Sequence, residues 1–314
     1  MPYHRLLWLL MAMIFSISSC SNVATLDIND DGSDKFSSQE GVIYSKGPKL
    51  RVGVVNFGND TPRKVNGIEQ VATNILTTLL HESGNFIVIP QQDLDSIMEQ
   101  QKLSLTGIIS AESSSKIGGI LGLNAIVTGS ITSYAEFVEG STSFFSQTKI
   151  QVSKVGVDYR IVDTTTGVQL FSAHGEGEFR KKSDSVMGFG SKSSFDVSLK
   201  DGALRDALKR AMIEINNQFP SELWMGRVAN REGEIVYINA GQQTGFEIGD
   251  FLSVHKVTKD IIDPQTGLSL GQAPGQEIGL LEITGFFGLD GSIAQILSGE
   301  GGKRGDVVRF NGGS

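Results

Sequence analysis

The sequence of 314 residues has a single cysteine, Cys20, so no disulfide can form within the chain. It carries 27 basic and 35 acidic residues, for a net charge of -8. This acidic balance argues against nucleic acid as a partner, because phosphates are neutralised by clustered Lys and Arg. No serine lies in a nucleophile elbow, and no set of acid, base and nucleophile converges. We therefore expect no enzyme, no cofactor and no metal site.

Only one long apolar run occurs, the twelve residues from Leu6 to Ile17. As a helix it would rise about 18 Å, less than the ~30 Å of a bilayer core, which favours a secretory signal at residues 1–19 over a transmembrane helix. Ile17-Ser18-Ser19-Cys20 resembles a bacterial lipobox, which implies cleavage before Cys20 and lipid attachment to it. The alternative is an ordinary signal with a stray thiol. Ser21 implies sorting to the outer membrane, and loss of Arg5 changes the net charge from -8 to -9.

Residues 20–48 are polar and show no sustained periodicity, so they are expected to form a flexible tether between the lipid and the first domain. Asp27 to Gly32 begins like an EF-hand calcium loop. The twelfth position is Ser38 where that loop requires Glu, so a solvated acidic linker is the favoured interpretation.

Residues 49–219 alternate between strand and helix patterns, which predicts an α/β domain. Strands are expected at Arg51–Phe57, Phe86–Pro90 and Ala125–Ile131, with a turn at Gly58–Asp60 and helices near Ile68–Leu80, Leu94–Met98, Ser113–Leu121 and Ala203–Phe219.

Residues 132–200 contain no convincing helix and several period-two stretches. Gly156–Val162 and Val168–Ala173 are expected to be strands joined by a turn at Asp163–Gly167. Phe195, Val197 and Leu199 alternate with polar residues, as in a strand. The pattern predicts two inserted β-hairpins, near 132–155 and 174–200.

Residues 221–314 hold 18 of the 38 glycines and repeat short strand patterns, which predicts a separate all-β module, a barrel or a sandwich, after Pro220. Its strands are expected at Glu234–Asn239, Asp250–Val257, Glu277–Thr284, Ser292–Leu297 and Asp306–Phe310, with 220–228 as the junction. Each Gly-Asp pair suits a tight turn before a strand. Arg304-Gly305-Asp306 also spells an integrin-binding tripeptide, but the turn is the favoured interpretation.

The α/β region resembles the curli production assembly/transport (CsgG) family of outer-membrane lipoproteins. The resemblance rests on the lipobox, Arg51–Phe57, Ser115–Ile131 and Tyr159–Gly167. It implies an outer-membrane, periplasm-facing homo-oligomeric ring in which each copy adds two hairpins to one membrane β-barrel, and export of an amyloid-like, curli-type subunit. The alternative is a non-transporting envelope scaffold or ring adaptor.

Two features depart from that family's channel. The loop Asn59–Val65 has no aromatic residue, so no pore-constricting residue can be assigned. Arg180-Lys181-Lys182 and Asp184 would be costly on a lipid face.

His81, His174 and His255 are expected to be ordinary surface or packing residues, and Gly175–Glu178 does not open a helix as a phosphate loop would.

The C-terminal region resembles the last module of the flagellar T-ring (FlgT) family. The matching segments are Gly226–Val228, Val236–Gly241, Gly245–Asp250, Asp263–Gly267 and Gly305–Val308. This resemblance implies a ring-building role without catalysis.

Overall fold

The computed structural model describes residues 47–100, 113, 117–118, 120–143, 146–184, 197–219, 224–257, 260–262, 264–265, 269–272 and 275–312. The chain divides into two units, Met1–Glu40 and Gly41–Ser314, and all described residues belong to the second. The signal sequence, Cys20 and the Asp27–Ser38 segment lie outside the described residues.

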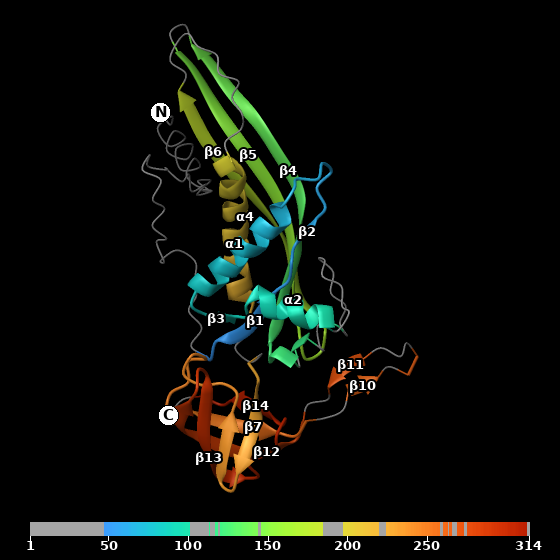
Figure 1. Ribbon diagram of the computed structural model, residues 1–314, viewed down its shortest axis with the longest axis vertical. Coiled ribbons are helices and arrows are strands. Elements are labelled where there is room, and N and C mark those ends of the chain that lie inside the picture. The colour runs from blue at the N-terminus through green and yellow to red at the C-terminus, as the bar shows by residue number, and fades with distance from the viewer. Residues whose placement is uncertain are drawn as a thin grey trace, which may run out of the picture. The chain divides into compact units, whose positions relative to one another are not determined.

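A mixed sheet organises the α/β part (Figure 1). Its elements are β1 (Leu50–Val54), β2 (Gly58–Asn59), α1 (Ile68–Glu82), β3 (Phe86–Val88), α2 (Gln91–Gln100), β4 (Ala125–Ser143), β5 (Ser146–Asp163), β6 (Gln169–Asp184) and α4 (Val197–Gln218). The strand order is β3-β1-β4-β5-β6, with β2 beside β4. β1 pairs in parallel with β3 and β4, whereas β4, β5 and β6 are antiparallel.

Helices cover both faces of this sheet, because β1 and the residue that follows it have buried apolar side chains on opposite sides. Val52 and Val54 belong to the core that includes α1 and α4, while Val55 packs with Leu94 and Met98 of α2 on the opposite face. α1 buries one apolar stripe and ends just before Gly84, whose φ of 74° is the left-handed geometry typical of a helix end. The predicted α1 and α2 are thus present, and residues 113, 117–118 and 120–121 are helical as expected.

Three strands extend far beyond β1 and β2, at 19, 18 and 16 residues for β4, β5 and β6. We call the outer part, residues 132–143, 146–156 and 176–184, the arm. A β-bulge opens the arm on β4, where Ile131 lies opposite Val157 but Ser133 already lies opposite Gly156. Thr132 is the extra residue, so odd-numbered residues face the helices before it and even-numbered ones, such as Tyr134, after it.

Two sequence-based expectations in this region are wrong. The interval 132–155 holds the end of β4 and the start of β5, but 174–200 holds β6 up to Asp184 and then, from Val197, the first turn of α4. Leu199 is fully buried and lies four residues before the buried Ala203, so its apolar pattern belongs to a helix. Gly58–Asn59 is not a turn either, since it pairs in parallel with Ser130 and Ile131 of β4.

The C-terminal region is a closed barrel in the order β12-β13-β8-β7-β14-β9. Its strands are β7 (Gly226–Glu232), β8 (Ile235–Ile238), β9 (Phe251–His255), β12 (Glu277–Phe287), β13 (Gly291–Gly299) and β14 (Val307–Phe310), and β10 (Asp260–Ile262) pairs with β11 (Ser269–Gln272) as a separate ribbon. Of the two predicted architectures the barrel is therefore present. β7 was missed because its first residues were assigned to the junction.

The Gly-Asp turns of the barrel are confirmed. Gly249 and Gly305 have φ of 99° and 95°, and strands β9 and β14 begin two residues later. The Asp306 carboxylate accepts hydrogen bonds from the backbone N–H of Val257 (3.2 Å) and Lys303 (2.8 Å). With Asp306 only 2% exposed, its side chain is held inside the turn and cannot reach a receptor.

Candidate functional site

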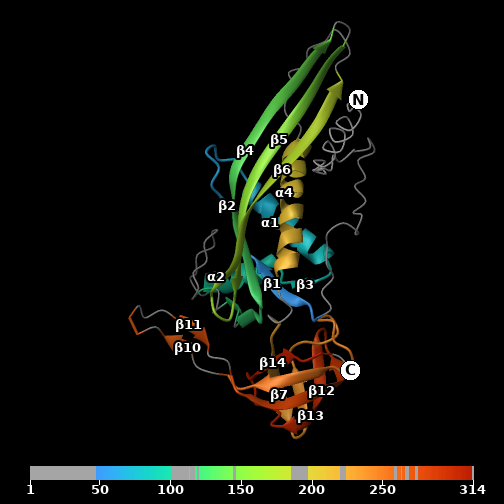
Figure 2. The ribbon, with the colours of Figure 1, turned by 180° about the vertical axis from the view of Figure 1, so that it is seen from behind.

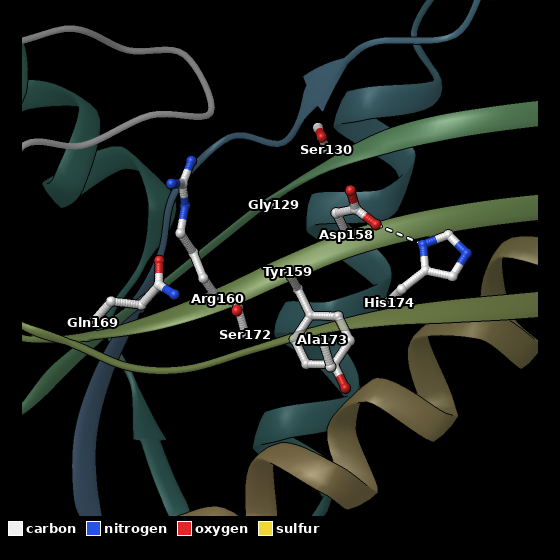
Figure 3. Close-up of a pocket in the computed structure, with 9 residues that line it drawn as sticks. All are labelled: Gly129, Ser130, Asp158, Tyr159, Arg160, Gln169, Ser172, Ala173 and His174. Atoms are coloured by element: carbon white, nitrogen blue, oxygen red, sulfur yellow. Dashed lines mark hydrogen bonds and ion pairs between the residues drawn. The ribbon is translucent and has the colours of Figure 1, made fainter.

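A hollow of about 470 Å³ lies on the sheet at the base of the arm, on the face away from α1 and α4 (Figure 3). The sheet register builds it from rows of polar side chains. Ser130, Asp158 and His174 stand side by side on β4, β5 and β6, and Arg160 stands next to Ser172 in the adjoining row. Gly129, Gln169, Tyr159 and Ala173 complete the lining.

Tyr159 points in the opposite direction, toward the helices. Its hydroxyl donates a hydrogen bond to Glu214 of α4, and its side chain is buried. Burial, with the hydrogen bond to Glu214, raises the pKa of the Tyr159 phenol. The residue therefore stays neutral and fastens α4 to the sheet.

His174 and Asp158 form the centre of the hollow, with 2.5 Å between Nδ1 and Oδ1. Nε2 of His174 lies 3.6 Å from Oε1 of Glu176. The hydrogen bond to Asp158 raises the pKa of His174. Both partners are about half exposed, so solvent screens the pair and its effect on stability is small.

A row of ion pairs continues from the hollow along the arm. Lys154 Nζ lies 2.8 Å from Oε2 of Glu178, Arg180 Nε bonds the other oxygen of Glu178, and Arg180 Nη1 lies 2.7 Å from Oε2 of Glu139. The hydrogen bond from Lys154 lowers the pKa of Glu178. We call this side of the sheet the charged face; it carries Glu139, Lys154, Asp158, His174, Glu176, Glu178 and Arg180.

On the other face of the sheet, α4 packs at the base of the arm (Figure 2). A Cβ at Gly177 would lie 2.1 Å from the carbonyl oxygen of Ala203, and one at Gly202 would lie 2.4 Å from the ring of Phe179. Strand and helix backbones are thus in direct contact. Gly175–Glu178, rejected above as a phosphate loop, is a segment of β6. Its second glycine, Gly177, lets the backbone of α4 pack directly against the strand.

The remaining residues singled out from the sequence are dispersed. His81 is exposed at the end of α1, and His255 bonds Ser253 (2.9 Å) and the carbonyl of Gly275 (3.2 Å) within the barrel region. In the loop without aromatics, the Asn59 amide bonds the Val65 carbonyl (2.9 Å) and Glu69 (3.2 Å). Within the described part of the chain, no group of three or more His, Cys, Asp or Glu residues could hold a metal ion.

The pair of His174 and Asp158 was missed because the partners are 16 residues apart. The predicted turn Asp163–Gly167 is centred on Thr165, so hairpin symmetry alone would place Asp158 opposite Ser172. A register shift between Ile161 and Val162 brings Asp158 opposite His174 instead.

Among the residues that the structure describes, no helix is both long and apolar enough to cross a membrane.

Comparisons with known proteins show what this chain is similar to. A curated relative, "Putative lipoprotein NMB1126/NMB1164" of Neisseria meningitidis serogroup B (strain ATCC BAA-335 / MC58), is 26% identical over 153 residues, which are 46% of this chain and 64% of the relative. The chain thus spans less than two thirds of that relative's length.

Among solved structures, lipoprotein GNA1162 from Neisseria meningitidis matches with a TM-score of 0.30 and 16% identity, covering 54% of this chain and 96% of that one. The PelC dodecamer from Paraburkholderia phytofirmans matches with a TM-score of 0.27 and 15% identity, covering 55% and 96%. Likeness at these TM-scores is too low to carry a structural argument.

The model of one family, described as "Curli production assembly/transport component CsgG", matches residues 43–247. The match begins before β1, includes the whole arm and α4, and ends in the barrel region. The chain belongs to the CsgG family.

Proposed function

We propose that this chain is a lipid-anchored outer-membrane protein that forms a periplasmic ring and acts as an envelope scaffold without transporting cargo. The observation that carries this proposal is the polarity of the arm. A strand that crosses a membrane needs about 9–11 residues, with apolar side chains at alternate positions facing lipid. The strands of the arm are long enough to cross a membrane, so the chemistry of the arm's two faces decides whether they could lie against lipid.

Apolar side chains such as Phe137 and Val152 lie on the arm, but charged groups interrupt them on both faces. One is the charged face, with Glu139, Lys154 and Arg180. The residues that alternate toward the other face include Glu136, Gln151 and Lys181, so polar groups interrupt that face too. A Lys or Arg at mid-bilayer depth costs about 2–4 kcal/mol in a membrane barrel, so an arm of this composition is stable in water and unfavourable in lipid.

The second candidate is the export channel for curli-like subunits. Family membership favours it, together with strands of 19, 18 and 16 residues. In either case we infer that catalysis plays no part, and that the closed barrel adds a ring contact, as the flagellar T-ring resemblance implies.

Conductance separates the two candidates. The full chain, extracted in detergent and added to planar bilayers, should form rings visible in single-particle images but pass no ions above the level of protein-free bilayers. Discrete, stable conductance steps that an antibody against the arm blocks would establish the channel and refute the scaffold.

Changing Cys20 to Ala should release the protein from the membrane, because the acyl chains are the anchor that the lipobox implies. We expect the variant as a soluble or an uncleaved form that is absent from the outer-membrane fraction. Ser38→Ala, in the same tether, is the control and should remain in the outer-membrane fraction. Processed Cys20→Ala that still sediments with outer membranes would mean that another part of the chain holds the lipid.

A further inference from the structure

Among the residues that the structure describes, only polar side chains point into the hollow at the base of the arm. Tyr159 and Ala173 turn their side chains to the opposite face of the sheet, and Gly129 has none. The side chains that enter the hollow are those of Ser130, Asp158, Arg160, Gln169, Ser172 and His174 (Figure 3). Most small-molecule sites are lined by hydrophobic side chains. An apolar molecule in this hollow would leave the lining without hydrogen bonds, so the hollow suits a polar ligand.

Charges of both signs share the hollow. Asp158 and Arg160 are two residues apart on β5, so they lie on one face, at roughly 7 Å along the strand. An anion drawn to Arg160 would be repelled by Asp158, and a cation drawn to Asp158 would be repelled by Arg160. His174 adds no site for anions, because its two ring nitrogens face the carboxylates of Asp158 (2.5 Å) and Glu176 (3.6 Å). These groups therefore favour an uncharged ligand.

Hydroxyl groups match this lining. Asp158 accepts hydrogen bonds, and Arg160 donates them. The Gln169 amide and the hydroxyls of Ser130 and Ser172 do both. Each hydroxyl of a sugar also donates and accepts, so a sugar can pair with donors and acceptors that are mixed in this way. The volume of about 470 Å³ lies within the range of small-molecule sites.

His174 is held in place at the arm side of the hollow. Its Nδ1 bonds Asp158, and its ring lies against the β5 backbone at Gly156, where a Cβ would be 3.2 Å from Cε1 of the ring. The side chains of His174 and Asp158 are nevertheless 50% and 57% exposed, so a ligand can reach both. Groups that are fixed before the ligand arrives reduce the entropy cost of binding.

We propose that the hollow binds a neutral saccharide, with Asp158 and Arg160 each pairing with neighbouring hydroxyls of the sugar. Ser130 on β4 and Ser172 on β6 bond the hydroxyls on either side. This inference goes beyond the scaffold function and does not depend on the oligomeric ring, because all the lining residues belong to one copy.

Saturation-transfer difference NMR tests the binding, because it detects weak ligands on large assemblies. The full chain is kept in a detergent without a sugar headgroup, and the probes are two neutral disaccharides, maltose and N,N′-diacetylchitobiose. We expect signal transfer to at least one of them, with a dissociation constant in the millimolar range. No transfer to either probe would overturn the proposal.

Ser172→Leu should weaken this binding about tenfold or more, because the larger side chain fills the hollow and removes a hydrogen-bonding hydroxyl. Ser172 is exposed, so the variant should fold like the wild type. The matched control is Ser298→Leu, at an exposed position of β13, which should bind the probe like the wild type. Equal binding by Ser172→Leu and the wild type would mean that the sugar lies elsewhere on the protein.

Inorganic phosphate tests the charge balance of the hollow. The wild type should not bind phosphate, whereas Asp158→Asn should, because Arg160 then has no opposing carboxylate beside it on β5. Line broadening of the phosphorus NMR signal measures this binding. Phosphate or glycine that displaces the disaccharide from the wild type would identify a site for ions or zwitterions and refute the saccharide. A variant Asp158→Asn that ignores phosphate would remove the charge argument for a neutral ligand.

Images of the assemblies separate this inference from the proposed function. Ser172→Leu should form the same rings as the wild type, since the hollow lies within one copy. Rings that bind neither disaccharide would refute the saccharide site and leave the scaffold in place. Disaccharide binding by a protein that forms no rings would refute the scaffold ring and leave the saccharide site in place.

Discussion

Replacing Gly177 with valine should dislodge α4 from the sheet and cost about 3 kcal/mol of unfolding free energy, at the upper end of overpacking effects. The new Cβ would lie 2.1 Å and 2.4 Å from backbone atoms of Ala203 and Ala207, where carbon contacts need about 3.5–4.0 Å. The strand propensity of valine would stabilise β6 by under about 1 kcal/mol. The steric clash is larger, so the net change in unfolding free energy is a loss. The helix backbone cannot move aside as a flexible side chain could.

Urea unfolding of the full chain measures this effect, with Gly140→Val as the control. Gly140 lies on β4 of the same arm, is exposed, and has no atom within 4 Å of its ideal Cβ position. The control should therefore match or slightly exceed the wild type. If both variants unfold at the same urea concentration, the close contact between β6 and α4 is not present in solution.

Replacing Asp306 with alanine should destabilise the barrel by about 3 kcal/mol, because it removes two hydrogen bonds to a charged acceptor, each worth about 1.5–3 kcal/mol. The donors are Val257 and Lys303, and Asp306 is almost completely buried. Asp306→Asn keeps the shape but turns a donor amide toward one of these N–H groups, so we expect only partial recovery.

Intrinsic fluorescence of Trp224 reports this change, since the ring is buried against Phe246, at 4.9 Å between centroids, beside the barrel core. The control is Glu234→Ala, which removes an exposed carboxylate from the turn between β7 and β8 and should leave the melting temperature within about 1 °C of the wild type, as expected of a surface change. An equal shift in both variants would mean that the buried turn contributes nothing beyond a surface charge.

Local patterns sufficed for much of this fold. α1 follows from apolar residues at helical spacing and from Gly84, and the turn after β5 follows from Asp163, whose carboxylate binds the Thr165 N–H (2.7 Å) and the Thr166 hydroxyl (3.0 Å). In each case the signal and the structure lie within a few residues of each other. Five of the six barrel strands were found for the same reason, since glycine turns separate them.

Features that depend on distant residues were not accessible in this way. The start of α4 was misplaced because Val197 and Leu199 fit the alternation of a strand as well as one face of a helix. The burial of Leu199 in the structure distinguishes the helix from the strand. The charged face needs the register of β5 on β6, which brings Lys154 to Glu178 and Asp158 to His174. The hydrogen bond from the Glu178 backbone N–H to the Asp206 carboxylate joins a strand to a helix across 28 residues, and no periodicity in the sequence predicts it.

The bulge at Thr132 sets a rule for insertions and deletions in the arm. Because Thr132 is the extra residue of the bulge, removing it alone would join Ser133 to Ile131 and keep Tyr134 and every later β4 side chain on its present face. Removing one residue further along would instead turn the side chains after it to the opposite face. Loss of two consecutive residues further along would shorten the strand and keep each side chain on its face. Related chains can therefore vary the length of this strand by even steps, whereas an odd step requires the bulge itself to be gained or lost.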